Sequence, residues 1–301
     1  SGNPYQLSSR MDLERLYENA SAYYILTNNI DISDSNWVMF NNNDFGGVLD
    51  GQGYNVVGLT YNGSQDFAFI NYVAMAGVIK NLNFTDVSIT INSTSSISLG
   101  VIALYNTGTI ERVYVDGVIS ISGQSVYVGG AVYNNSGNVK DSMTDVQINV
   151  LQATGTTYIG GLIGISSGPV VSSYTLGGIY LNVNTNFDIF LGGLVGFHNI
   201  SYITDSYSLS NIVIDNINPY NNNRIGKLIG HSNSHTQIFN SYKFNETTII
   251  VDSISYDDNY YGVSLEKSTI GYNFIFNTLS WDELVWDSMS LNEKGPLLIQ
   301  N

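Results

Sequence analysis

Two aspartates are the candidates for catalysis in this chain. Glycan-cleaving enzymes place two carboxyl groups at the scissile bond, one as general acid and the other as base or nucleophile. Asp141 and Asp205 hold the same position in two similar segments, Val139–Ser142 and Ile203–Ser206. We take these two residues as the catalytic candidates. The simpler interpretation, which we favour, is that Asp141 forms a surface ion pair with Arg112 worth under about 1 kcal/mol.

Four further aspartates could offer oxygen ligands to Ca²⁺, which binds carboxylate and carbonyl oxygens. They are Asp31, Asp34, Asp44 and Asp50. Their spacing matches neither an EF-hand loop nor the glycine-rich calcium repeat. Aspartate also favours turns, and turn formation explains all four without a metal. We expect no cofactor.

Tyrosine is abundant, with 22 residues in the chain. Exposed aromatic rings stack on sugars and anchor protein interfaces, so tyrosines near turns are candidates for ligand binding. Six residues fit this description: Tyr105, Tyr133, Tyr158, Tyr220, Tyr260 and Tyr261. The alternative is that many of them are half-buried members of side-chain ladders.

Charge and the remaining residue types narrow the function. The chain has 10 Lys and Arg against 25 Asp and Glu, a net charge of −15, which disfavours nucleic acids and anionic lipids as partners. It has no cysteine, and no apolar run approaches the length of a membrane span. The three histidines, His198, His231 and His235, form no His-Glu-x-x-His pair, so zinc proteolysis has no ligand set here.

The elements that position these residues are set by an internal repeat. A glycine-containing segment recurs at Val128–Val132, Ile159–Gly164, Leu191–Gly196 and Ile225–Gly230, with a degenerate copy at Leu99–Ile102. Each copy is followed by a second β-rich segment and then by a looser third one. Three short strands in about 30 residues is the plan of one coil of a parallel β-helix. The glycines mark positions where a side chain would clash or where φ is positive.

Stacked coils place equivalent residues in columns along the axis, about 4.8 Å apart. One column contains small residues, which we place inward at a tight corner where hydroxyl groups bond along the stack: Val113, Ser142, Ser173, Ser206 and Ser241. A neighbouring column is apolar and is the predicted core stripe: Ile110, Val139, Val170, Ile203 and Ile238. Asp141 and Asp205 would lie two coils apart, about 10 Å, a separation that suits an inverting pair.

The chain is expected to form one domain over residues 1–301. Residues 1–22 form an N-terminal cap with a helix over residues 9–18, in which Ser9 is the N-cap and Asp12 lies three residues on. Residues 23–273 form about eight coils, a shaft of roughly 40 Å. Residues 274–301 have lost the repeat and are expected to form the opposite cap or exit.

The glycine segments resemble the GLUG repeat of bacterial surface proteins. The resemblance rests on Gly161–Gly164 and Gly193–Gly196, each followed by a Ser-Tyr pair, and on the turn Phe45–Gly53 near the start. It implies a right-handed β-helix on a secreted or cell-surface protein, commonly one module of a longer chain. Some members of the family carry these repeats ahead of a zinc peptidase that cuts immunoglobulin A.

These observations favour a non-catalytic, extracellular β-helix. We expect an adhesin or stalk at a bacterial cell surface, with a host or neighbouring-cell protein or glycan as its partner. The alternatives are a polysaccharide lyase or glycoside hydrolase that uses the carboxylates of neighbouring coils, and a spacer domain of a larger surface peptidase.

Overall fold

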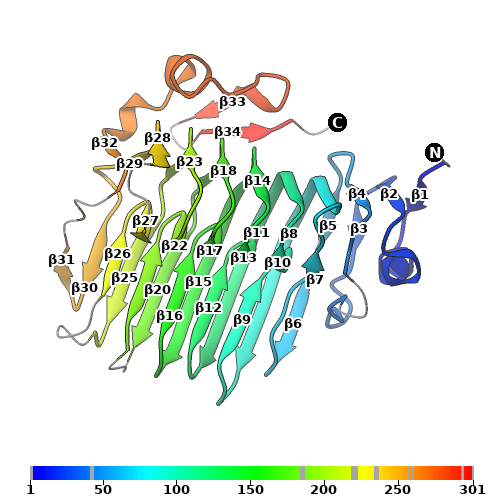
Figure 1. The fold of residues 1–301 in the computed structure, drawn as a ribbon, viewed down its shortest axis with the longest axis horizontal. Coiled ribbons are helices and arrows are strands. Elements are labelled where there is room, and N and C mark those ends of the chain that lie inside the picture. Colours follow the sequence, from blue (N-terminus) through cyan, green and yellow to red (C-terminus); the bar gives the residue numbers. More distant parts are fainter. Residues whose placement is uncertain are drawn as a thin grey trace.

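The chain winds as a solenoid of parallel β-strands, as predicted. The computed structural model describes residues 3–40, 44–183, 187–217, 223–233, 237–256, 258, 261–292 and 295–299. Over these residues the coils stack in about six turns (Figure 1). The expected number of eight is too high. The described residues of 23–63 and 249–265 add strands to only one of the three long sheets, and in these residues only Phe40 and Phe45 form bridges to a second sheet.

Two of the long sheets are regular, with one strand from each coil. Within the described residues, sheet B consists of β7 (Ile70–Val73), β10 (Ala103–Asn106), β13 (Val132–Asn135), β17 (Ile163–Ser166), β22 (Val195–His198) and β27 (Ile229–Ser232). Sheet C consists, over the same ranges, of β9 (Ile97–Gly100), β12 (Val126–Gly129), β16 (Thr157–Gly160), β21 (Ile189–Gly192) and β26 (Arg224–Gly226).

Sheet A runs the whole length of the stack. It starts with β1 (Tyr5–Leu7), β2 (Tyr23–Leu26), β3 (Ile30–Asp31), β4 (Val48–Asp50), β5 (Asn55–Val57) and β6 (Thr60–Gly63). Its central strands are β8 (Val78–Asn92), β11 (Thr109–Gly123), β14 (Asn138–Lys140), β15 (Met143–Ala153), β18 (Val170–Val171), β19 (Tyr174–Thr175) and β20 (Gly178–Val183). It ends with β23 (Ile203–Thr204), β24 (Tyr207–Ser208), β25 (Asn211–Asp215), β28 (Ile238–Phe239), β29 (Tyr242–Phe244), β30 (Ile249–Val251), β31 (Ile254–Ser255) and β32 (Val263–Leu265).

Sheets C and B meet at a corner where only backbone fits. Gly129, Gly160, Gly192 and Gly226 end consecutive strands of sheet C and lie one above another. A Cβ atom at Gly160 would lie 1.8 Å from the carbonyl oxygen of Ile163, and the equivalent separations at the other three glycines are 1.8 to 2.1 Å. None of the four has a positive φ. Of the two reasons considered for this glycine column, steric exclusion is therefore the correct one.

The predicted serine column forms a buried hydrogen-bond ladder. The Oγ atoms of Ser142, Ser173, Ser206 and Ser241 each accept a backbone N–H from the preceding coil at 3.2 to 3.4 Å, starting with the N–H of Val113. Each hydroxyl donates to the carbonyl two residues earlier in its own coil at 2.7 to 2.8 Å. These polar groups are buried, and a buried donor or acceptor without a partner costs about 1–3 kcal/mol. The ladder avoids this cost because it gives each of them a hydrogen-bond partner.

A second polar column lies inside the stack at the end of sheet B. It consists of Asn106, Asn135, Ser166, His198 and Ser232, which are at most 1% exposed. Asn106 donates to Asn135 at 2.7 Å, and Asn135 donates to Ser166 at 3.1 Å. The Nδ1 atom of His198 contacts the Oγ of Ser232 at 2.8 Å. The predicted core stripe is apolar as expected, with Ile110, Val139, Val170 and Ile203 fully buried and Ile238 partly buried.

The N-terminal helix lies at one end of the stack (Figure 1). It comprises α1 (Arg10–Glu14), continued by the 3₁₀ turn η1 (Arg15–Asn19). Ser9 is the N-cap, and its side chain and that of Asp12 form a reciprocal capping box. A helix at this position and its Ser9 N-cap are confirmed, although only Arg10–Glu14 is α-helical.

Only two of the four large apolar side chains of this helix are buried. Leu13 and Leu16 pack into the core, whereas Met11 and Tyr17 are 69% and 47% exposed. The chain changes from α-helix to 3₁₀ turn at Arg15, which tightens the helix and alters which side chains share a face.

The opposite end of the stack is closed by residues that follow the last full coil. The hydroxyl of Tyr261 accepts the N–H of Ser232 and donates to its carbonyl oxygen, at 3.0 and 3.2 Å. Asp258 accepts the N–H of Lys227 at 2.6 Å and pairs with the buried ammonium group of Lys243 at 3.4 Å. These side chains supply the partners that a further coil would offer to the edge strands, and they cover the edges.

The C-terminal segment lies along the side of the stack and not at its end. We call its described residues, 270–292 and 295–299, the strap. It follows the 3₁₀ turn η3 (Lys267–Thr269) and contains the π-helical turn η4 (Asn273–Thr278) and the antiparallel pair β33 (Trp286–Asn292) and β34 (Gly295–Leu298). In Figure 1 it is the orange and red segment that runs back over the ends of β28, β23 and β18.

Aromatic packing explains this position of the strap. Tyr174 and Tyr207 are fully buried and stack at 4.7 Å. Trp281 stacks on Tyr207 at 5.6 Å, and the hydroxyl of Tyr174 donates to the carbonyl of Pro296 at 2.6 Å. Tyr174 and Tyr207, which are register partners in adjacent coils, thus form a second hydrophobic core with the strap.

We predict that Gly160→Ala destabilises the chain by at least about 2–3 kcal/mol, because the backbone corner must open to admit the methyl group. Urea unfolding measures the change. The matched control is Gly46→Ala, whose Cβ would meet no atom nearer than 4.0 Å. An equal unfolding midpoint for both variants contradicts the steric role of the corner.

Candidate functional site

The two catalytic candidates share a backbone column with unusual geometry. The residue before each position of the serine column has a left-handed conformation: φ is 52° at Arg112, 50° at Asp141, 47° at Ser172, 52° at Asp205 and 42° at Asn240. Aspartate and asparagine tolerate this conformation better than most residues. The backbone is therefore sufficient to explain aspartates at these positions.

The structure places Asp141 and Asp205 two coils apart, as the repeat predicts and the register of β14, β18 and β23 requires. The carboxylate of Asp205 accepts hydrogen bonds from Asn240 and Thr204, and its carbonyl oxygen accepts the indole N–H of Trp281 at 2.8 Å. Neither aspartate lines the cavity next to Arg112.

Asp141 has the more unusual surroundings. Burial raises the pKa of its carboxyl group, the charges of Lys140 and Arg112 oppose this shift, and Glu111 and Asp282 add to it. The expected ion pair between Arg112 and Asp141 is replaced by a different one. The guanidinium group of Arg112 contacts Glu111 at 2.5 Å and Asn81 at 2.6 Å.

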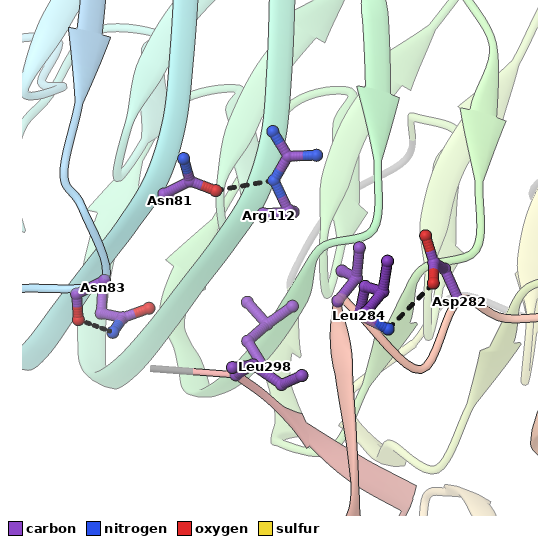
Figure 2. Close-up of a pocket in the computed structure, with 9 residues that line it drawn as sticks. Asn81, Asn83, Arg112, Asp282, Leu284 and Leu298 are labelled. Atoms are coloured by element: carbon purple, nitrogen blue, oxygen red, sulfur yellow. Dashed lines mark hydrogen bonds between the residues drawn. The ribbon is translucent and has the colours of Figure 1, made fainter. Parts of the chain in front are cut away.

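A cavity of about 350 Å³ opens between this column and the strap (Figure 2). The stack contributes Gly53, Asn81, Asn83 and Arg112 to its lining, and the strap contributes Asp282, Leu284, Val285, Leu298 and Ile299. Sequence reasoning missed this site because the strap residues are about 170 or more positions from Arg112 and no repeat places them. The raised pKa of Asp141 and the neighbouring carboxylate of Asp282 are the features that most resemble those of an enzyme active site.

The four calcium candidates do not gather into one site. Asp50 is buried and is held by Lys80 at 3.3 Å and by Asn81 at 2.9 Å. Asp34 pairs with Arg10, Asp31 accepts the N–H of Ser33 at 2.9 Å, and Asp44 is exposed. In the part of the chain that the structure describes, no three His, Cys, Asp or Glu side chains are grouped to hold a metal.

Three of the six tyrosine candidates belong to one continuous row of rings. We call this row the aromatic strip: Tyr72, Tyr105, Tyr127, Tyr133, Tyr158, Phe190, Phe197 and His231. It follows the corner between sheets C and B, and rings from the two sheets touch across it. Tyr127 stacks on Tyr133 at 5.7 Å, and Phe190 meets Phe197 edge-on at 5.4 Å.

The rings of the strip are partly exposed but their faces are largely occupied. Tyr158 and Phe190 stack at 4.7 Å with an angle of only 4° between their planes. Tyr105, the most exposed of the three candidates in the strip, is 39% exposed. Burial, with the neighbouring phenols of Tyr105 and Tyr127, raises the pKa of Tyr133 to about 12. The strip thus offers ring edges and neutral hydroxyl groups to a partner.

Of the other three tyrosine candidates, the structure describes only Tyr261. Tyr261 is 5% exposed and serves in the end cap, so its assignment to ligand binding is corrected. It is buried because its hydroxyl group makes the hydrogen bonds to Ser232 that the backbone of a further coil would otherwise make. Tyr220 and Tyr260 lie outside the described residues, as does His235.

His198 is fully buried, and its Nε2 atom has no hydrogen-bond partner among the described residues. Burial lowers the pKa of its imidazole to about 4. It is a member of the inner polar column and takes no part in a surface site. Within the same described residues, no helix is long and apolar enough to span a membrane.

Comparison with known proteins identifies the fold. No protein-family profile matches the sequence, and no curated protein matches it. A solved structure of a candidate immunoglobulin A1 protease from Bacteroides ovatus aligns with a TM-score of 0.75 and 16% identity over 99% of this chain and 93% of that one. A structure named IgA1 protease aligns with a TM-score of 0.61 and 16% identity over 87% of this chain but only 21% of that one. At this identity the likeness shows the β-solenoid alone.

We predict that His198 makes the chain less stable in acid. Its pKa is near 4 in the folded chain and about 6.5 in the unfolded chain, so the unfolded chain binds the additional proton between these values. This contribution is present in full above about pH 6.5 and is lost as the pH falls towards 4, a change of about 3 kcal/mol.

The variant His198→Asn should not show this loss of stability in acid, because asparagine does not titrate. Asparagine already occupies the equivalent position in two earlier coils, at Asn106 and Asn135. Urea unfolding at about pH 7 and about pH 4 measures the loss, with His231→Asn on the aromatic strip as the control. If His198→Asn loses as much stability on acidification as the parent chain, the assignment is wrong.

Proposed function

We propose that this chain is a non-catalytic recognition module of an extracellular bacterial surface, in which the aromatic strip contacts a protein of a host or neighbouring cell. The observation that carries the proposal is the strip itself. It is an uninterrupted, partly exposed row of aromatic side chains along a rigid shaft. Tyrosine is enriched at protein interfaces because it combines a large apolar ring with a hydroxyl group at little entropic cost.

Ring orientation favours a protein over a glycan as the partner of the strip. A sugar stacks on the face of an aromatic ring, and the faces of Tyr158 and Phe190 are turned towards each other. A protein can instead use ring edges, hydroxyl groups and the half-exposed side chains between them, such as Asn134 and Ile165. A glycan partner is therefore the alternative outcome of the test.

One comparison favours a second function, that of a spacer. The chain spans 21% of the structure named IgA1 protease, so a solenoid of this kind occurs there within a much longer chain. A spacer must be stiff, but it does not need a surface that binds a partner. The two functions differ in what they predict for variants of the strip.

The test compares adhesion of beads coated with the full chain to epithelial and bacterial cells. We predict adhesion that protease treatment of the cells abolishes. The triple variant Tyr105→Ala, Tyr127→Ala and Tyr158→Ala should lose at least about tenfold in adhesion, as expected for loss of central aromatic contacts. The control Tyr180→Ala alters a tyrosine on sheet A and should adhere normally.

A second variant separates recognition from folding. The triple Phe variant at Tyr105, Tyr127 and Tyr158 keeps the ring packing and removes three hydroxyl groups, so it should fold normally and adhere less. Absence of adhesion, or equal adhesion by all variants, favours the spacer and contradicts the proposal. Adhesion lost with glycosidase treatment but not with protease treatment contradicts a protein partner.

A further inference from the structure

The cavity beneath the strap has the size and lining of a small-molecule site and lies on another face from the aromatic strip. Its volume of about 350 Å³ falls within the range of ligand pockets, about 300–1,000 Å³. Two segments distant in the sequence form its walls, the left-handed column of the stack and the strap (Figure 2).

Hydrogen bonds to the stack hold the donor of this cavity in place. The Nε atom of Arg112 donates to Asn81 at 2.6 Å, and Nη2 donates to Glu111 at 2.5 Å. Asn81 is itself fixed by a bond to Asp50 at 2.9 Å. The Nη1 group of Arg112 has no acceptor in the described part of the chain and remains available to a ligand.

The strap and the wall beside it supply acceptors. One carboxylate oxygen of Asp282 accepts the backbone N–H of Leu284 at 2.8 Å, which fixes the side chain and leaves the other oxygen available. Asn83 donates to Asn55 and to the carbonyl of Gly53, at 2.9 and 3.2 Å, so its amide is oriented as well. The cavity therefore combines a fixed cationic donor with fixed carboxylate and amide groups.

Apolar side chains complete the lining on the strap side. Leu298 is 8% exposed, whereas Leu284 is 86% exposed at the mouth of the cavity. A ligand that suits such a lining has hydroxyl groups on one edge and C–H groups on a face. A hexopyranose has both, because adjacent ring hydroxyls can accept from a guanidinium group and donate to a carboxylate.

Charge excludes an anionic ligand. Arg112 is already paired with Glu111, and Asp141 and Asp282 add negative charge next to it. Two further cations lie next to this group, and both are already paired: Lys140 with Glu111 at 2.8 Å and Lys80 with Asp50 at 3.3 Å. A uronic acid would meet repulsion from these carboxylates, whereas an uncharged sugar would not.

We propose that this cavity binds one uncharged hexopyranose unit, with Nη1 of Arg112 and the carboxylate of Asp282 on its hydroxyl groups. The site does not depend on the function proposed for the aromatic strip. Cell adhesion and sugar binding are measured separately and can fail separately.

The test is a titration of the full, ¹⁵N-labelled chain with the methyl α-pyranosides of glucose, mannose and galactose, followed by NMR. At least one glycoside should shift the Nε–H resonance of Arg112 and the amide of Leu284 saturably, with a dissociation constant of about 1 mM for a ligand of this size. Arg112→Gln and Asp282→Asn should each weaken binding by about tenfold or more.

Both variants are chosen to keep the fold. Glutamine occurs at positive φ elsewhere in this chain, at Gln52, and asparagine retains the oxygen that accepts the N–H of Leu284. The matched controls, Arg15→Gln and Asp287→Asn, lie outside the cavity and should bind like the parent chain. The proposal is overturned if none of the three glycosides causes saturable shifts, if both cavity variants bind unchanged, or if glucuronate binds more tightly than the neutral sugars.

Discussion

The backbone corner between sheets C and B is the constraint on which the rest of this structure depends. A side chain at Gly160 would occupy the same space as the carbonyl of Ile163, and the same holds one coil below and above. The corner therefore admits one path of the chain, and each coil repeats it. Because the path repeats, equivalent residues lie above one another, and single hydrogen bonds and ring contacts become ladders. The serine ladder and the aromatic strip are two results of this repetition.

Repetition also explains why a residue type alone is weak evidence for chemistry in this fold. Asp141 and Asp205 occupy left-handed positions that favour aspartate for conformational reasons, and their separation follows from the coil spacing. A site that stands out must break the repeat. The cavity does so, because the strap crosses several coils and brings Asp282 to the left-handed column beside Arg112. The aromatic strip, by contrast, is a property of the repeat and extends along the shaft.

The sequence was sufficient to predict contacts that depend on the repeat or on neighbours in the chain. The capping box at Ser9, the order of the serines and the buried column at Ile110 were all predicted correctly. The position of the strap was not predictable, because it depends on Tyr174 and Tyr207 meeting Trp281 across a long stretch of chain. The burial of Tyr261 was missed for the same reason, because it too depends on a contact between distant residues. Its partner Ser232 lies in β27, the last strand of sheet B, whose outer edge no further coil covers. The number of coils was overestimated because strands at the ends join sheet A alone.

Disulfide formation between engineered cysteines tests most directly whether the coils repeat one path. The chain has no native cysteine, so the background is clean. Val118 and Gln147 are register partners in adjacent coils of sheet A, about 4.8 Å apart, whereas Asn211 lies in the same column about three coils from Val118, or about 14 Å. The account predicts that the pair Val118→Cys and Gln147→Cys oxidises to a disulfide, detected by mass, and that Val118→Cys with Asn211→Cys remains reduced. Oxidation of the second pair with the first left reduced would contradict the register and with it the corner that sets it.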